Sequence, residues 1–389
     1  MDDTHALPDD VLELIFLRLH SPVCLLHAAA TCKQWRRIIA GASFLRRFHS
    51  VRGPPPVAGV YYDAPCHPRR RPDVVTSPWL DFGIDDRFFS LDFLPDSEIS
   101  PWVWKLEDRR GSLLLFHRLR EPQGSASYGS IVICEPLTQR FEMVDPPFSR
   151  FEGHTFANAY LVDGESGGIG LENFRVVFRQ NVRGIYSAAG MFTMGSNGQQ
   201  SWSKLSMHEL MRNAGPSTEL IPSSSVYWFC EGRKVAALDK GTGEFTSVQL
   251  PEVEDWDFHK ELYDFVVTAG HDGTARIVIS GPSGDLKVFA RLQSSREWAL
   301  ARSVRLPALI QDLPEYEPTF FVIDEYALIR SDGTPVILIS PGREKRWWFH
   351  LDVDTMEVEP AADPDVAVAY PCQLPWPPTL NACTSCHDS

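Results

Sequence analysis

The sequence lacks a long apolar run and an excess of positive charge, and each absence excludes a class of protein. No apolar stretch approaches the roughly 18 residues that a membrane-spanning helix needs. The formal net charge is −14, whereas nucleic-acid binders need Lys and Arg clustered on a basic surface. We therefore expect neither a membrane protein nor a nucleic-acid binder.

Cysteine is also scarce, with eight residues scattered over 389. That number does not make a disulfide framework in a chain of this size. Residues Met1 to His5 are acidic and polar and do not resemble a secretory signal. We therefore expect a reducing compartment, the cytoplasm or the nucleus.

The length and composition indicate a globular protein of two modules. Hydrophobic residues make up 43% of the chain and charged residues 23%, which is enough apolar material to form a core. A single core rarely grows beyond about 250 to 300 residues. We therefore expect one small module and one large one.

The first forty residues predict three short helices. Pro8 suits a first helical turn, and Asp9 and Asp10 place negative charge at the positive end of the helix dipole. Ser21 and Pro22 predict the start of a second helix, and a third follows from about Cys32. We expect Gly41 to close the third helix as a left-handed cap.

The first of these helices is apolar on nearly every side, because seven of the nine residues from Val11 to Leu19 are apolar. A surface helix of a globular protein needs only one apolar stripe. A partner protein would account for the additional apolar surface. The alternative is a helical cap that packs on the chain's own C-terminal domain.

The residues of this segment, about 5 to 48, resemble an F-box. The resemblance rests on the Leu-Pro start, on the Cys-Lys-x-Trp-Arg segment and on the spacing between them: Leu7, Pro8, Asp9, Asp10, Val11, Leu12, Ile15, Phe16, Arg18, Leu19, Leu25, Leu26, Cys32, Lys33, Trp35, Arg36, Ile39 and Phe44. His20, Ser21 and Ala28 to Ala30 depart from the usual family pattern. The resemblance implies a Skp-type adaptor as partner and, through it, the cullin and RING subunits of a ubiquitin ligase. The positions expected at the adaptor contact are Leu7, Pro8, Val11, Ile15, Leu25 and Trp35.

Beyond a Pro-rich linker at 49–56 the pattern changes to short strands separated by turn residues. One unit recurs, consisting of an apolar strand, a polar turn and a second strand with an aromatic or other large apolar anchor. The anchors are Phe141, Trp202, Phe245, Trp298 and Met356, at spacings of 61, 43, 53 and 58 residues. A further strand is expected before each hairpin, in the stretches Ser112 to Phe116, Phe174 to Phe178, Val226 to Phe229, Arg276 to Ile279 and Val336 to Ile339.

With one more strand per unit, these hairpins predict four-stranded sheets that repeat about every 50 residues, as in a β-propeller of about six blades. We expect the first blade in the divergent stretch Val57 to Trp104. The segments Cys134 to Phe141 and Leu238 to Phe245 resemble blades of the kelch-like F-box-associated propellers frequent in plant F-box proteins, although the paired glycines of a strict kelch repeat are mostly missing. A non-repeating β-sandwich is the alternative.

Three short motifs formally match catalytic, haem or repeat signatures without the context that these signatures need. Gly164 to Gly168 matches a hydrolase nucleophile elbow, but a strand rather than a helix is expected after it, so we interpret it as a turn. Cys383 to His387 matches a haem or zinc motif but lies at the C-terminal end, where we expect a disordered tail. Trp256-Asp257 is a single WD dipeptide. We expect no catalytic residues, no metal site and no cofactor.

The resulting hypothesis is a mainly β protein with a small α-helical N-terminal module. Its parts are a three-helix F-box (5–48), the linker (49–56), a β-propeller (57–374) and a tail (375–389). Its predicted function is substrate recognition in a Skp–cullin–F-box ubiquitin ligase, without catalysis by the chain itself. The alternatives are a propeller that senses a small molecule and an enzyme built on the propeller, each with the F-box as an accessory docking module.

Target binding is expected on propeller loops, because loops vary without disturbing the rigid blades that hold them. Two connections are unusually long or charged, His117 to Gly129 and Gln311 to Pro318. The second carries an acidic and aromatic surface suited to a basic partner. Its candidate target-binding residues are Asp312, Glu315, Tyr316 and Glu317.

Overall fold

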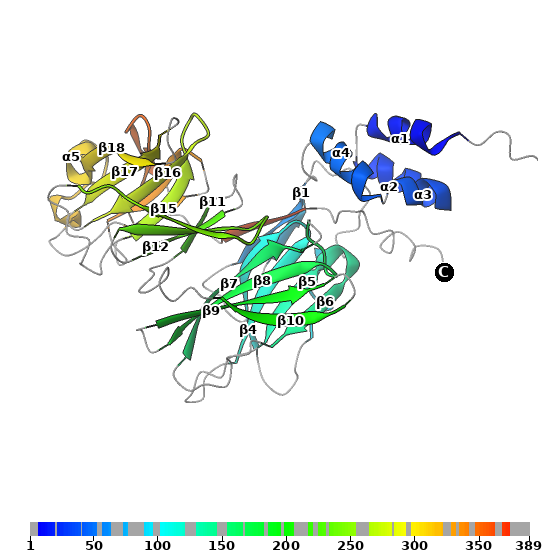
Figure 1. Ribbon diagram of the computed structural model, residues 1–389. Coiled ribbons are helices and arrows are strands. Elements are labelled where there is room, and N and C mark those ends of the chain that lie inside the picture. The colour runs from blue at the N-terminus through cyan, green and yellow to red at the C-terminus, as the bar shows by residue number, and fades with distance from the viewer. Residues whose placement is uncertain are drawn as a thin grey trace, which may run out of the picture.

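The structure is a computed structural model of the chain. It describes residues 7–19, 22–39, 41–52, 57–63, 73–76, 89–95, 102–120, 130–145, 154–165, 168–182, 186–195, 198–205, 217–220, 225–230, 233–253, 264–281, 284–292, 297–321, 328–331, 334–341, 347–361 and 368–373. In this part of the chain no helix is long and apolar enough to cross a membrane. Figure 1 shows helices at the N-terminus followed by a succession of antiparallel sheets.

The described part of the N-terminal module forms four helices rather than the three predicted: α1 (Asp9–Leu17), α2 (Pro22–Thr31), α3 (Lys33–Ile39) and α4 (Ala42–Arg52). Pro8 occupies the N-cap position of α1, and α2 starts at Pro22 as predicted. The expected left-handed cap at Gly41 is wrong, because this glycine does not adopt a positive φ. Its amide instead donates to the carbonyl of Ile38, and α4 begins directly afterwards and extends into the stretch predicted as linker.

One apolar core holds the helical module together. Phe16 of α1 packs edge-on against Phe44 of α4, with ring centroids 6.4 Å apart, and Phe44 stacks on Phe48. Phe44 and Phe48 lie four residues apart and therefore on one face of α4. The buried members of the core are Leu12, Phe16, Leu25, Ala28, Ala29, Ile39, Phe44 and Phe48.

The described residues that follow the helical module form six antiparallel sheets, which we call blades 1 to 6. Five of them have four strands in simple sequence order, which is consistent with a β-propeller and confirms the predicted fold class. Blade 2 contains β3 (Trp102–Arg110), β4 (Leu113–Arg120), β5 (Ile131–Glu135) and β6 (Arg140–Val144); blade 3 contains β7 (His154–Asp163), β8 (Phe174–Val182), β9 (Tyr186–Met194) and β10 (Gln200–Leu205); blade 4 contains β11 (Ser217–Leu220), β12 (Ser225–Cys230), β13 (Lys234–Asp239) and β14 (Phe245–Gln249); blade 5 contains β15 (Asp264–Ala269), β16 (Ala275–Ser280), β17 (Asp285–Arg291) and β18 (Trp298–Arg305); blade 6 contains β19 (Leu328–Ser331), β20 (Val336–Ser340), β21 (Trp348–Asp352) and β22 (Val358–Ala361).

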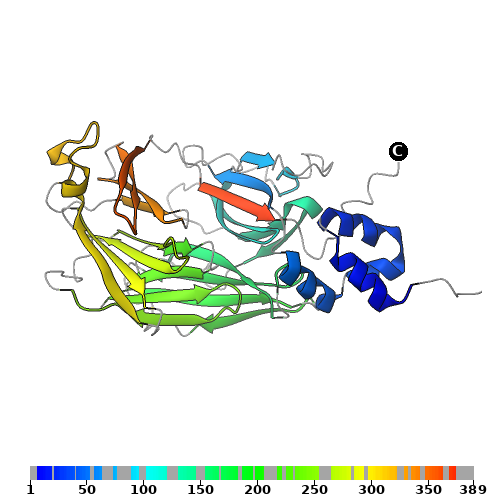
Figure 2. The same ribbon diagram turned by 90° about the horizontal axis from the view of Figure 1, so that it is seen from above.

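Blade 1 is built from both ends of the sheet region. β1 (Val57–Asp63) pairs with β2 (Asp73–Thr76) on one side and with β23 (Val368–Gln373) on the other. Figure 2 shows β23, in red, beside the blue β1. The predicted first blade, Val57 to Trp104, therefore needs correction: Trp104 lies on β3 in blade 2, and β23 supplies the additional strand of blade 1.

Apolar side chains join each blade to the next. Successive residues of a strand point to opposite faces of its sheet, and in blade 5 the residues alternate accordingly. Val266 and Val278 pack in a cluster with blade 6, whereas Val267 and Ile277 pack in a cluster with blade 4. Similar clusters join blade 1 to 2, blade 2 to 3 and blade 3 to 4.

The turns between the third and fourth strands of blades 4 and 6 share one hydrogen-bonding pattern. Asp239 Oδ1 accepts the backbone N–H groups of Gly241 and Thr242, at 2.7 and 2.9 Å. In blade 6, Asp352 Oδ1 accepts hydrogen bonds from the backbone N–H groups of Asp354 and Thr355, both at 2.9 Å. These donors lie two and three residues after Asp352, as in blade 4. This repetition is independent support for an internal repeat.

Each of these turns needs one residue in the left-handed region. Gly243 takes this position in blade 4 with φ 76°, and Met356 takes it in blade 6 with φ 65°. Met356 was therefore wrongly predicted as a strand anchor. Val358, on β22, is the residue that corresponds to the anchor Phe245.

Ion pairs at strand ends and in turns connect blade 2 to blades 3 and 4. Arg110, next to the β3–β4 turn, binds both carboxylate oxygens of Asp163 in blade 3, at 2.5 and 2.9 Å. Lys240, in the β13–β14 turn, donates to Asp108 Oδ1 of blade 2 at 2.8 Å, and Asp108 Oδ2 accepts the backbone N–H of Leu161 in blade 3. Asp108 therefore contacts both blade 3 and blade 4.

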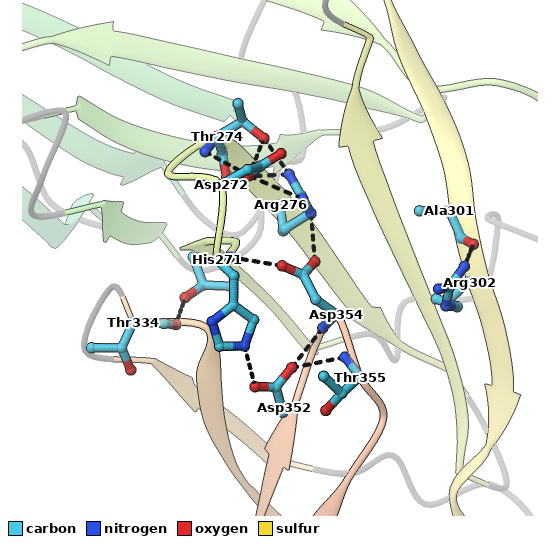
Figure 3. Close-up of polar contacts among 11 residues, drawn as sticks. His271, Asp272, Thr274, Arg276, Ala301, Arg302, Thr334, Asp352, Asp354 and Thr355 are labelled. Carbon is cyan, nitrogen blue, oxygen red and sulfur yellow. Dashed lines mark hydrogen bonds and ion pairs between the residues drawn. The ribbon is translucent and has the colours of Figure 1, made fainter.

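A second polar junction joins blades 5 and 6 (Figure 3). Asp354 accepts from the Nε of Arg276 at 3.0 Å and from the backbone N–H of His271 at 2.7 Å, while the His271 ring lies 2.6 Å from Asp352. Burial raises the pKa of Asp352, but its interactions with Thr355, His271 and the backbone N–H of Asp354 together outweigh burial and lower the pKa overall. These contacts fix the junction, and we assign them a structural role.

Candidate protein-interaction surfaces

The N-terminal end of the module exposes an apolar stripe, which we define as Leu7, in the segment just before α1, and Val11, Leu14 and Ile15 on α1. Their exposed fractions are 51%, 37%, 56% and 44%. Val11, Leu14 and Ile15 have the three- and four-residue spacing of one helical face. Leu12 and Phe16 point the other way, into the module core. The predicted apolar surface therefore exists. Its exposed side chains on α1 lie on one face of the helix.

The structure divides the predicted adaptor-contact residues into exposed and interior groups. Pro8 is exposed together with Leu7, Val11 and Ile15. Leu25 is completely buried in the core, where it stabilises the module instead of offering a surface. Trp35 is half-buried, and Leu14, the most exposed residue of the stripe, was not among the predicted residues.

Polar contacts at the edges of α1 hold the stripe in place. Asp9 pairs with Arg37 of α3 at 2.6 Å and accepts a hydrogen bond from Gln34 at 2.8 Å. The bond from Gln34, followed by the charge of Arg37, lowers the pKa of Asp9. Arg47 of α4 pairs with Glu13 on the next turn of α1. α1 is thereby tied to α3 and α4 while its apolar stripe stays uncovered by any described residue.

Trp35→Ala is expected to weaken adaptor binding by about 2 kcal/mol or more, as truncation of an aromatic anchor commonly does. The Trp35 ring packs edge-on against Phe16, with centroids 5.2 Å apart. Its loss therefore also loosens the helix that carries the stripe. Calorimetric titration with the adaptor, accompanied by circular dichroism, separates the two effects, and an unchanged Kd removes Trp35 from the contact.

Strand order places the two predicted target loops at the same ends of their blades. In an antiparallel four-stranded blade, the connections from strand 2 to 3 and from strand 4 to the next blade emerge on one side. The segment after β4 connects strands 2 and 3 of blade 2. The stretch from Gln311 to Pro318 belongs to the connection from strand 4 of blade 5 to blade 6. Residues 121–129 of the first loop lie outside the described residues.

His117 is not part of a loop, contrary to the prediction. It pairs with Lys105 within the β3–β4 ladder and is 2% exposed. Burial, assisted by the charge of Lys105, lowers the pKa of His117 to about 4. Its Nδ1 lies 3.9 Å from Glu107 Oε1. The imidazole is consequently neutral at pH 7.

We expect the free energy of unfolding to fall as the pH drops from about 6.5 towards 4. In this range His117 is protonated in the unfolded protein but stays neutral in the folded protein, where its pKa is lower. Above about 6.5 both states are neutral at this site, and this contribution to stability is then complete. The slope from one histidine is at most about 1.4 kcal/mol per pH unit. Urea unfolding of the wild type and of His117→Gln across this range measures it, and equal slopes would refute the assignment.

The second predicted target loop follows a short helix, α5 (Leu306–Ile310), and ends in a 3-10 turn (Pro318–Phe320). Asp312, Glu315 and Glu317 are exposed, as predicted, whereas Tyr316 is half-buried. Tyr316 packs against Phe320 and Trp347, with ring centroids 6.0 and 6.2 Å away. The Trp347 Nε1 donates to the carbonyl of Pro314 at 3.1 Å. The loop is thus an acidic surface supported by a small aromatic cluster.

The remaining sequence motifs carry no assembled site. The hydrolase-like segment from Gly164 lies in the turn between β7 and β8, where the Gly164 amide donates to the Gly168 carbonyl at 2.8 Å. A strand follows it, as predicted. Ser166, Trp256 and the segment Cys383 to His387 lie outside the described residues.

Comparison with known protein families identifies the helical module. Residues 4–50 match the model of the F-box-like family. The chain therefore carries an F-box-like domain at its N-terminus, and an F-box domain implies binding to a Skp-type adaptor. No curated protein is a significant match to the chain.

The solved structures that resemble the chain include proteins with low sequence identity. AztD from Citrobacter koseri is 10% identical, with 70% of this chain and 61% of that chain covered and a TM-score of 0.35. The Dos1 propeller is 9% identical, with 69% and 62% covered and a TM-score of 0.40. YCF48 bound to D1 peptide is 11% identical, with 70% and 71% covered and a TM-score of 0.36. The strand order of the six blades is consistent with a propeller architecture.

Proposed function

We propose that this chain is the substrate-recognition subunit of a Skp–cullin–F-box ubiquitin ligase. The F-box-like domain binds a Skp-type adaptor, and the adaptor connects it to the cullin and RING subunits. A kelch-like propeller holds the target protein. The chain acts by proximity, because it raises the effective concentration of the target near the ubiquitin-charged enzyme without catalysing bond formation itself.

The uncovered apolar stripe on α1 is the observation that carries this proposal. Four large apolar side chains stand more than a third exposed on a module that matches an F-box. Aliphatic side chains gathered on one helix face are a typical surface for a partner in a helix-based interface. A helical cap packed on its own propeller would cover such a stripe, whereas the described residues leave it open.

Co-purification of the full chain with a Skp-type adaptor tests this function. We expect a stoichiometric complex that is lost when residues 1–50 are deleted, and we expect the adaptor to raise the yield and the thermal stability of the full chain. Proximity labelling in cells, with and without the F-box, would then identify targets. Failure of the pure proteins to associate would refute the proposal.

The acidic loop is proposed as part of the target-binding surface. It presents three exposed carboxylates at Asp312, Glu315 and Glu317. Neutralising all three with Asn, Gln and Gln is expected to reduce capture of a basic target while adaptor binding and Tm stay nearly unchanged, since the aromatic cluster beneath the loop is kept.

Glu172→Gln with Glu244→Gln and Glu357→Gln is a matched control, because these three carboxylates are exposed in turns at the opposite end of blades 3, 4 and 6. A Gly-Ser replacement of residues 121–129 tests the other predicted loop in the same way. Target capture that survives both loop variants would place recognition elsewhere on the propeller.

A further inference from the structure

Helix α4 ends in a turn that carries an exposed serine, Ser50. The Ser50 hydroxyl donates to the backbone carbonyl of Arg47 at 2.8 Å, and residues three apart lie on one face of a helix. α4 ends two residues later, at Arg52, and helix ends fray in solution. The Ser50 hydroxyl is therefore open to a second protein, on a turn that can unwind to fit an enzyme's groove.

Arg47 forms one of the contacts that hold α1 in place. Its Nη1 pairs with Glu13 of α1, and the two side chains are 55% and 25% exposed. An ion pair this exposed contributes little to stability by itself. α1, however, has nine residues, and a helix of that length is not stable without its neighbours. The whole module is also small enough to have little stability in excess. Loss of the pair with Glu13 therefore lowers the fraction of molecules in which α1 presents its apolar stripe.

Positive charge precedes Ser50 in the sequence, because Arg46 and Arg47 lie four and three residues before it. Basophilic serine kinases select such arginines, since carboxylates in their substrate grooves form charge-assisted hydrogen bonds with guanidinium groups. Ser112 follows Arg109 at the same three-residue spacing, but it is 3% exposed and lies in the turn between β3 and β4. Ser50 thus combines the basic spacing with an accessible hydroxyl.

We propose that Ser50 is a phosphorylation site and that its phosphate loosens α1 by drawing Arg47 away from Glu13. This inference rests on the proposed function, because it concerns the control of adaptor binding. In the reaction, the Ser50 hydroxyl oxygen attacks the γ-phosphorus of ATP held by a basophilic serine kinase. The new oxygen–phosphorus bond forms, the bond to the β-phosphate oxygen breaks and ADP leaves. The hydroxyl proton passes to the catalytic base of the kinase.

The phosphate competes with Glu13 for the Arg47 guanidinium through charge and proximity. It carries about −1.5 to −2 charges at pH 7 and three acceptor oxygens, whereas a carboxylate carries one charge and competes less well. It also lies three residues from Arg47 on the same helix. Negative charge at the C-terminal end of a helix opposes the helix dipole and weakens the last turn. That turn follows Phe48, which is buried in the module core, so its loosening also weakens the packing beneath α1.

The test uses the full chain with phosphoserine inserted during translation in place of Ser50. The matched control carries phosphoserine in place of Ser247, an exposed residue of β14. Both chains gain the same charge, but only the first gains it beside Arg47. We expect the phosphate at position 50 to raise the Kd for a Skp-type adaptor about five- to tenfold and to lower the thermal stability of the helices, measured by circular dichroism. The control should behave as the unmodified chain.

Glu13→Gln tests the cause of this effect, because it removes the partner of Arg47 on α1. In this background the phosphate at position 50 should raise the Kd by a smaller factor than in the wild type, as a double-mutant cycle measures. A basophilic serine kinase with ATP is expected to phosphorylate Ser50 in the full wild-type chain. Peptide mass spectrometry detects the modified peptide, and Ser50→Ala should abolish it.

The outcomes separate this inference from the proposed function. If the unmodified chain does not bind the adaptor, the proposed function fails and this inference fails with it. Three results overturn only the inference when the unmodified chain binds: equal Kd values for the two phosphoserine chains, an undiminished effect of the phosphate in Glu13→Gln, or no phosphate on Ser50 after incubation with the kinase.

Discussion

Ile15→Glu is expected to reduce affinity for a Skp-type adaptor by about 3 kcal/mol, roughly a hundredfold in Kd, in the range of hot-spot residues at interfaces. Ile15 is 44% exposed and lies in the middle of the α1 stripe. A carboxylate at this position would lose its hydration on binding without gaining a partner. Glu is at least as good a helix former as Ile, so α1 itself should remain folded.

Val51→Glu is the matched control for this experiment. Val51 is an exposed aliphatic residue of the same module, 62% accessible, but it lies near the end of α4 rather than on α1. The same change of charge there should leave the Kd nearly unaltered. Calorimetric titration of both variants with the adaptor gives the two Kd values, and circular dichroism confirms that the helices remain folded. Equal affinities for wild type and Ile15→Glu would show that the stripe is not the adaptor contact.

Lys240→Ala is expected to destabilise the propeller by about 3 to 5 kcal/mol, the usual consequence of removing one partner from a buried ion pair. Lys240 and Asp108 are 0% and 2% exposed. Their contact joins blade 4 to blade 2, across 132 residues of chain. Without the ammonium group, the Asp108 carboxylate stays buried but loses the charge of Lys240, while the backbone N–H of Leu161 still donates to it. Urea unfolding of the full chain measures the loss.

Two further variants make this test specific. Arg305→Ala removes a cation from a surface pair with Asp285, whose side chains are 74% and 35% exposed, and should cost no more than about 1 kcal/mol. Lys240→Met combined with Asp108→Leu should recover part of the stability, because no buried charge remains. The recovery stays incomplete because the Leu161 N–H loses its acceptor. A loss from Lys240→Ala as small as that from Arg305→Ala would contradict the buried-pair interpretation.

In the helical module, local sequence patterns predicted some features correctly and missed others. The start of α2 at Pro22 follows from the fixed φ of proline, which is a property of one residue. α4 was not predicted, although Phe44 and Phe48 have helical spacing, because the basic residues around them obscured the pattern. Leu25 was placed on the surface because its sequence neighbours resemble the adaptor-binding part of an F-box. Its burial depends on how four helices pack together.

In the propeller, the hairpins of blades 2 to 6 were predictable because their strands are short apolar runs separated by turn residues. This pattern depends on neighbours in sequence and on the alternation of side chains along a strand. The misplaced anchor at Met356 shows the limit, since left-handed backbone at a non-glycine residue leaves little trace in the sequence. The junction of His271 with Asp352 likewise joins turns about 80 residues apart, which no local pattern connects.

The sequence by itself determined an F-box-like helical module, a repeat of four-stranded antiparallel sheets and the apolar character of α1, because each depends on contacts between residues close along the chain. Only the tertiary structure decided that β23 completes blade 1, that Lys240 pairs with Asp108 and that the apolar stripe consists of four residues while Leu25 lies inside. These features arise from surfaces brought together after the chain has folded back on itself. Their partners are therefore selected by three-dimensional packing rather than by sequence spacing.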